Sequence, residues 1–221
     1  MSELGREEIL NRVAKGKSLQ GLDLSKANLV EVDLTGVSLQ GCSLEGANFY
    51  GSILERTDFS GASLSGADFY KADLQGARLM GATLTRARLK DCDLSEANLS
   101  GANLSNANLE WADLKSADMT GTNLERCNLY QANMKRANLT GADFRGASFE
   151  NANLKGAILV GSAGQVCSFY RARLAYADLE GAKLDGVNLK QADLSGTNFE
   201  GVSGLTAEQI EYARSGGAKG L

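Results

Sequence analysis

The residues of this chain that could do chemistry recur at multiples of twenty positions. Carboxylates, phenols and ammonium groups each occupy a set of such positions: Asp33, Asp73, Asp93, Asp113 and Asp193; Tyr50, Tyr70, Tyr130 and Tyr170; Lys115, Lys135 and Lys155. Clustered carboxylates could hold a cation, whereas exposed aromatic and basic side chains are enriched at protein-binding hot spots. Either role requires a fold that brings residues twenty positions apart next to each other.

Catalysis is not predicted. The chain has no histidine, which removes the commonest general base and metal ligand. It shows no nucleophile–base pair, no phosphate-binding glycine loop and no metal-ligand spacing. The aspartates recur because their side chains can bond local backbone near a bend, so they are expected to be structural. We predict a protein with no enzymatic activity, cofactor or metal.

These positions follow a repeat of five residues. From Ala97 to Met119 each unit reads as a small residue, Asp or Asn, a large apolar residue that we call the centre, and two variable residues. Centres recur without a slip from Leu19 to Phe199, and only Gly164 is not large and apolar. Steps of five would scatter the centres around a helix and alternate them across a flat strand. Only a chain that bends at every unit can point them all inward, which predicts a solenoid.

Glycine spacing predicts how many units make one coil. One corner position holds Gly every twenty residues from Gly21 to Gly201, whereas the other three corner positions are mixed. A coil of twenty residues has four sides, which we name first to fourth after their earliest centres, Leu19, Leu24, Leu29 and Leu34. The units then make about nine coils, stacked ~4.8 Å apart. We expect the glycine corner alone to have a backbone conformation or close approach that suits glycine.

The repeat resembles that of the pentapeptide repeat family, in which Ala, Asp or Asn, and Leu or Phe are followed by two variable residues. The resemblance covers residues 17 to 202. It implies a right-handed quadrilateral β-helix, so the predicted fold is an all-β solenoid with a short capping helix at each end. Handedness comes from the resemblance alone.

Three segments are expected: an N-terminal capping helix in residues 1–16, the β-helix in 17–203, and a C-terminal capping helix and tail in 204–221. Ile9, Leu10 and Val13 share one face of a helix over 6–15 that would cover the open first coil; a partner-binding helix is the alternative. The sequence Thr-Ala-Glu-Gln from Thr206 is a capping box, which predicts a helix over 207–214.

The bulk properties predict a cytoplasmic protein with no membrane contact. No run of eighteen apolar residues and no signal-peptide pattern occurs. The cysteines all occupy the small inward position two residues before a centre: Cys42, Cys92, Cys127 and Cys167. We expect four reduced thiols that fill the core.

The outward residues predict a partner surface at one edge of the rod. Its members, expected from three neighbouring coils, combine aromatic area with positive charge: Trp111, Tyr130, Arg171, Lys135, Arg136, Lys155 and Arg173. We call this set the aromatic–basic edge. The competing interpretation is an ordinary solvated face with stacked aromatic rings.

The repeat is irregular between Ile158 and Cys167, where Gly164 replaces a centre. One interpretation is a bulge or rebuilt corner, with Phe144 partly filling the gap. The other is a hydrophobic patch that Ile158 and Val160 form with Met80.

The predicted function is a non-catalytic scaffold for protein–protein interaction, without direct nucleic-acid contact. The resemblance implies two alternatives: a DNA-mimicking rod that binds and protects or inhibits DNA gyrase, and an adaptor for a bacterial assembly such as a secretion system. The net charge of −4 is mild for a DNA mimic. Some family members dimerise through their C-terminal end, so Ile210 and Tyr212 are candidate dimer contacts, and both monomer and homodimer remain open.

The assignment of inward and outward positions makes a direct prediction. Leu104→Asp should lower the free energy of unfolding by several kcal/mol, because it buries a charge and leaves a gap, with about 3 kcal/mol typical of the gap alone. Ser105→Asp should leave it nearly unchanged. Urea denaturation of both variants measures the difference, and equal effects would contradict the assignment.

Overall fold

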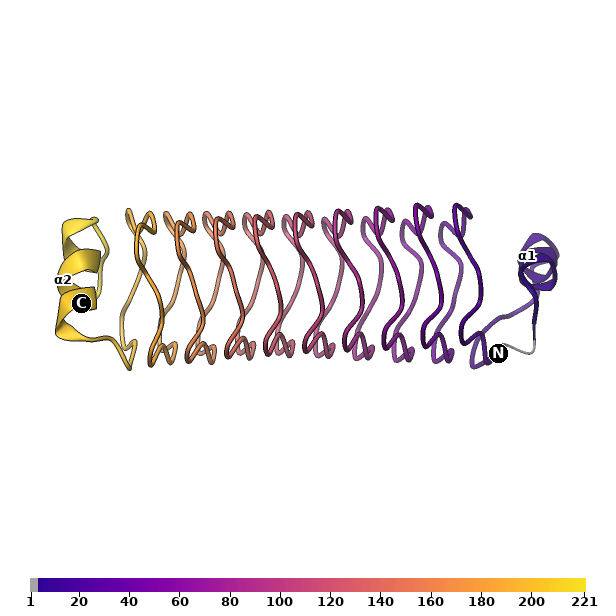
Figure 1. Ribbon diagram of the computed structural model, residues 1–221, viewed down its shortest axis with the longest axis horizontal. Helices are drawn as coiled ribbons and strands as arrows, with labels where there is room; N and C mark the ends of the chain where they lie inside the picture. Colours follow the sequence, from indigo (N-terminus) through magenta and orange to yellow (C-terminus); the bar gives the residue numbers. More distant parts are fainter. Residues whose placement is uncertain (1–3) are drawn as a thin grey trace.

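The predicted step of twenty residues is the pairing distance of the backbone. Parallel bridges join the residue before each centre to the residue twenty positions later, from Asp23 with Ser43 to Lys183 with Ser203. The coils stack into a rod with α1 (Arg6–Ala14) at one end and α2 (Ala207–Ser215) at the other (Figure 1). This computed structural model describes residues 4–221, so residues 1–3 of the expected N-terminal segment lie outside the described residues. The coil length and both helices are confirmed.

A tight turn follows every centre. The carbonyl of the centre accepts a hydrogen bond from the amide three residues later, as in Leu99 O with Ala102 N at 2.9 Å. Leu29 is the exception, because the Val32 amide donates to Ser52 Oγ at 3.4 Å. The residue two positions after the centre has φ between 52° and 70° at all corners, as the third residue of a type II turn requires. Because a bend comes every five residues, the pairings are isolated bridges rather than continuous strands.

The prediction that the glycine corner alone has its own backbone requirement is wrong. Gly101 has φ 64°, but Trp111 and Arg171 at another corner have φ 61° and 56°. Close approach does not distinguish the column either, since a Cβ added at Gly101 would meet nothing within 4 Å. All four corners therefore need the left-handed conformation, and nothing in the structure explains why one column is all glycine.

The centres and the small residues form one continuous axial core. Leu104 is fully buried and Ala102 nearly so, while Ser105 is half-buried on the outside. Hydroxyl groups at the small position mostly donate to carbonyls of the coil before, as Thr122 Oγ1 does to Leu99 O at 2.9 Å; the buried Ser162 hydroxyl is an exception, with no partner among residues 4–221. All four cysteines are buried and free, as predicted. Burial raises the pKa of the Cys127 thiol to about 12.

Phe144 fills the place of the missing centre. A Cβ at Gly164 would lie 2.1 Å from Cε2 of Phe144, so the ring occupies the space that a larger side chain would need. The bridges Asp143 with Ala163 and Ala163 with Lys183 continue through this stretch. The interpretation of this stretch as a bulge or rebuilt corner is therefore wrong, and the filling of the gap by Phe144 is confirmed.

Both terminal helices close an open coil. In α1, Ile9 is fully buried against the core, and Arg6 Nη1 donates to Val30 O at 2.7 Å. In α2 the capping box is present, with Gln209 N donating to Thr206 Oγ1 at 3.2 Å and Thr206 N to Gln209 Oε1 at 2.8 Å. The tail after α2 also pairs with the last coil, through a parallel bridge of Lys219 with Asn198 that the sequence did not predict.

Val166 tests the cost of the corner conformation. This β-branched residue has φ 60° and is 73% exposed, so Val166→Gly relieves strain and loses little buried area. We expect a gain of about 1 kcal/mol in the free energy of unfolding. Gly161→Val, at a corner with no neighbour within 4 Å of the added Cβ, should lose a similar amount. No change in either variant by urea denaturation would contradict the account of the corners.

Candidate partner-binding surfaces

The fold gathers the aromatic–basic edge along the third and fourth sides. A ladder of bridges joins Asp113, Asn133, Asn153 and Arg173 on the fourth side, one coil per step. The set therefore spans four successive coils, rather than the three that we predicted. Three steps of ~4.8 Å give a strip about 14 Å long.

Trp111 is the aromatic anchor of this strip. Its side chain stands at a corner and is 46% exposed. Lys90 Nζ lies 4.2 Å from the ring centroid, and the indole N–H donates to Gln131 Oε1. Lys90 also pairs with Glu110 at 3.2 Å. These contacts fix the position of the indole, which stays about half exposed.

The basic side chains of the edge have no ion-pair partner in the described part of the chain. Among residues 4–221, none of the five has a carboxylate oxygen within 4.0 Å: Lys135, Arg136, Lys155, Arg171 and Arg173. Two of them lie over aromatic rings, Arg171 at 4.9 Å from Tyr170 and Lys155 at 5.7 Å from Tyr176. The strip is thus positive on a chain whose net charge is −4.

Asp193 follows Arg173 in the fourth-side ladder, one coil beyond the strip. Hydrogen bonds from the Ser195 hydroxyl and amide lower the pKa of the Asp193 carboxyl, and the positive charges of Arg173 and Lys155 lower it further. Some basic residues elsewhere on the rod pair directly, as Arg88 does with Asp68 at 2.7 Å and Arg145 with Asp143 at 2.6 Å. Others, such as Lys71 and Lys190, have no ion pair among residues 4–221. The aromatic–basic edge therefore differs from the rest of the described surface because it gathers five basic side chains without ion pairs beside Trp111.

The aspartate column has a structural role, as predicted. Asp113 Oδ1 accepts from the Lys115 amide at 2.9 Å, and Asp33 Oδ1 accepts from the Thr35 amide at 2.9 Å. The same bond, to the amide two residues later, recurs along the rod. No group of three acidic, Cys or His residues in the described part of the chain is placed to hold a metal ion.

The proposed patch of Met80 with Ile158 and Val160 is not continuous. Met80 and Val160 share a column but lie four coils apart, with Ser100, Thr120 and Thr140 between them. Ile158 is 42% exposed and Val160 is half-buried. This stretch is therefore two separate apolar spots.

Sequence reasoning missed Tyr176. It is 66% exposed at the corner after the fourth side, with φ 60°. Its ring lies beside Lys155 and over Gly196, where an added Cβ would be 2.9 Å from it. The step from Lys155 to Tyr176 is one coil plus one residue, a spacing that would have found it.

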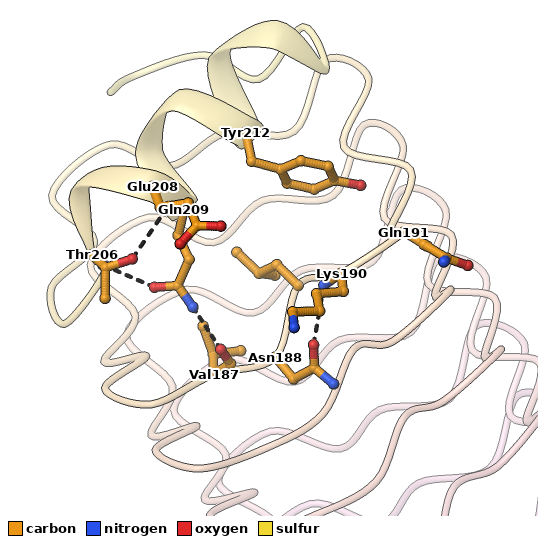
Figure 2. A pocket seen from close by; sticks show the side chains of 9 residues that line it. Val187, Asn188, Lys190, Gln191, Thr206, Glu208, Gln209 and Tyr212 are labelled. Atoms are coloured by element: carbon orange, nitrogen blue, oxygen red, sulfur yellow. Dashed lines mark hydrogen bonds between the residues drawn. The ribbon is translucent and has the colours of Figure 1, made fainter.

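The C-terminal end of the rod contains a groove beside helix α2. A groove of about 670 Å³ separates α2 from the last stretch of the third side (Figure 2). Tyr212 and Gln209 border it from the helix, and Asn188 and Lys190 border it from the coil. Of the candidate dimer contacts, Tyr212 is partly exposed but donates through its hydroxyl to Ala192 O at 3.0 Å, and Ile210 is half-buried. Tyr212 therefore contributes to closing the coil.

The chain belongs to the pentapeptide repeat family. Eight copies of the family's pattern, described as pentapeptide repeats, match residues 18–161 and 167–203 in overlapping stretches. The fold of this family is the right-handed quadrilateral β-helix, in agreement with the stacked four-sided coils described above. No curated protein matches the chain.

Three solved structures illustrate the relationship. HetL, a pentapeptide repeat protein involved in heterocyst differentiation regulation from the cyanobacterium Nostoc sp. strain PCC 7120, is 32% identical over 88% of this chain and 97% of its own, with a TM-score of 0.32. QnrB1, a plasmid-mediated fluoroquinolone resistance protein, is 20% identical over 86% and 96%, with a TM-score of 0.47. A thylakoid-lumen pentapeptide repeat protein of Arabidopsis thaliana is 38% identical over 54% and 69%, with a TM-score of 0.27.

Tyr212 tests whether the C-terminal helix is held by its side-chain bonds to the coil. Tyr212→Phe leaves Ala192 O without its partner, so the free energy of unfolding should fall by about 1 kcal/mol. Tyr176→Phe is the control, because its hydroxyl has no hydrogen bond to any of residues 4–221, and it should change stability by less than about 0.5 kcal/mol. Equal effects in urea denaturation would show that the bond does not stabilise the cap.

Proposed function

We propose that this protein is a non-catalytic scaffold that binds an acidic surface of a partner protein through the aromatic–basic edge. The observation that carries the proposal is a strip of five unpaired basic side chains, next to Trp111, on an acidic rod. Aromatic and arginine side chains supply most of the binding energy at many protein interfaces. Positive charge would steer an acidic partner to this strip and set its orientation.

The rigid ladder supports such a role. Each coil pairs with the next on all four sides, so outward side chains keep fixed spacings that a partner can match. Trp111, braced by Lys90 and Gln131, would lose little conformational freedom on binding.

We also propose a cellular setting for this scaffold. We place it in the cytoplasm, without membrane or direct nucleic-acid contact, as a monomer or as a homodimer through Ile210 and Tyr212. The described part of the chain has no helix long and apolar enough to span a membrane. The role of adaptor for a bacterial assembly such as a secretion system is one form of this proposal.

A DNA mimic that acts on DNA gyrase is less well supported. Its surface would need a continuous stripe of free carboxylates, but Asp58, Asp68 and Asp143 each face an arginine. The aspartate column is interrupted by Asn133, Asn153 and Arg173. The likeness to QnrB1 is one of fold only.

The proposal predicts the effect of a double substitution. Trp111→Ala with Arg136→Glu should leave the thermal midpoint almost unchanged, because both side chains are exposed and neither packs in the core. Affinity for a partner isolated from the source cell should fall tenfold or more, about 1.4 kcal/mol. Isothermal titration calorimetry with the purified partner measures the change.

The matched control is Met80→Ala with Arg86→Glu, which also removes one exposed apolar group and reverses one exposed charge. It should bind the partner as the natural protein does. Intact binding by the first double variant, or equal losses in both, would show that the partner binds elsewhere.

A further inference from the structure

The two ends of the ladder present different backbone groups. Within the rod, the amide of each centre and that of the corner residue donate to carbonyls of the next coil. Leu104 N, for example, donates to Asn123 O at 2.8 Å, and Asn106 N to Glu125 O at 2.9 Å. The residue before each centre donates in the opposite direction, to the carbonyl of the small residue in the coil before, as Asn123 N does to Ala102 O at 2.9 Å. The C-terminal coil therefore presents the amides of its centres and corners together with the carbonyls of its small residues, and a segment must offer carbonyl oxygens to pair with those amides.

The chain's own tail shows that this end accepts one more segment. On the first side, Lys219 O accepts from Phe199 N at 2.8 Å, and Lys219 N donates to Thr197 O at 2.8 Å. The pairing is parallel, as between coils. A short extended segment is thus sufficient to continue the ladder.

The third side has no such segment. Among the described residues, the amides of Leu189 and Gln191 have no hydrogen-bond partner, although Leu189 is only 2% exposed. Nearly buried amides without a partner are rare in native proteins. The side chains of α2 donate to backbone carbonyls of the last coil and leave these amides without a partner. Gln209 Nε2 donates to Val187 O at 2.6 Å, and the Tyr212 hydroxyl donates to Ala192 O.

The groove next to these amides has room for a ligand. Its volume of about 670 Å³ lies within the range of ligand sites, roughly 300–1,000 Å³. Leu189 and Tyr212 supply apolar lining, and Lys190 and Glu208 supply one charge of each sign. Among residues 4–221, Lys190 has no carboxylate oxygen within 4.0 Å. Figure 2 shows α2 standing apart from the backbone of residues 188–191, with the groove between them.

We propose that this edge binds an extended peptide segment of a partner protein, which adds to the third side as its next rung. This mode is β-augmentation, in which main-chain bonds give affinity and side-chain positions give specificity. The amides of Leu189 and Gln191 would donate hydrogen bonds to two backbone carbonyl oxygens of the segment. The proposal concerns a surface separate from the aromatic–basic edge.

The stacked columns indicate which side chains the segment carries. The residue over Leu189 would point inward and be apolar, like every centre. The residue over Lys190 would be acidic, because Lys90 and Glu110 pair at 3.2 Å in the same column. The residue over Asn188 would be Asn, as Asn128 Nδ2 donates to Asn108 Oδ1 at 3.4 Å. A segment of the type Asn-Leu-Glu satisfies all three positions.

The probe is an acetylated and amidated octapeptide, Ser-Asn-Ala-Asn-Leu-Glu-Trp-Ala, which has the sequence of residues 105–112. Hydrogen exchange of the ¹⁵N-labelled full chain is followed by NMR with and without saturating peptide. We expect exchange at the Leu189 and Gln191 amides to slow at least tenfold. The same peptide with Asp in place of Leu should give no protection.

A charge exchange tests the register. Lys190→Glu should weaken peptide binding at least threefold, the upper part of the range for an exposed ion pair, and a peptide with Lys in place of Glu should restore it. Lys155→Glu, on the aromatic–basic edge, should bind the original peptide normally. The result is therefore independent of whether that edge binds its own partner.

Three outcomes would overturn the proposal. One is no protection of the two amides at millimolar peptide. Another is equal weakening by Lys190→Glu and Lys155→Glu, which would show charge attraction without pairing. The third is protection of Leu189 and Gln191 in the protein alone together with a dimeric sedimentation mass, which would show that a second copy of the chain covers the edge.

Discussion

The left-handed corner is the constraint on which the rest of the structure depends. Every fifth residue has positive φ, and only about half of these residues are glycine. Each other residue at a corner costs about 1–2 kcal/mol in an isolated chain. The turn that results directs the centre inward and presents the corner amide to the next coil. Burial of the centre and pairing between coils, repeated at each corner, offset this cost only when neighbouring coils are present.

Because inward residues stabilise the rod, outward residues are free to serve binding. The columns follow from pairing at twenty residues, so a feature on one coil lies directly beside its neighbours on the next. Along the aromatic–basic edge, five basic side chains without an ion pair lie close together beside Trp111. A surface that gathers positive charge and aromatic area in this way, on a chain that is acidic overall, is where a partner of opposite charge would gain most.

The fold could be predicted from the sequence almost completely, because one five-residue rule applies from Leu19 to Phe199. Helix α2 could also be predicted, since its capping box is local. The prediction of a special glycine corner was wrong because glycine and other residues adopt the same conformation there. The bulge expected near Gly164 was wrong because Phe144, one coil away, compensates for a side chain that is absent.

The candidate surface could be predicted only in part. The columns identified Trp111 and its basic neighbours, but which charges are paired depends on side-chain reach that spacing does not show. Lys90 makes a cation–π contact with Trp111 and an ion pair with Glu110, whereas Lys155 makes a cation–π contact with Tyr176 on the following corner. The pairing of Lys219 with the last coil was not visible either, because the tail leaves the five-residue pattern. The side-chain contacts along the edge and the pairing of the tail with the last coil could therefore be identified only from the structure.

Hydroxyl-radical footprinting of the protein with its isolated partner tests the central claim most directly. Trp111, Tyr176 and Met80 are all exposed and react readily with radicals, and they lie on different parts of the rod. The account predicts that the partner strongly reduces oxidation of Trp111, reduces that of Tyr176 less, and leaves that of Met80 unchanged. Unchanged oxidation of Trp111 in a saturated complex, with protection of Met80 instead, would contradict it.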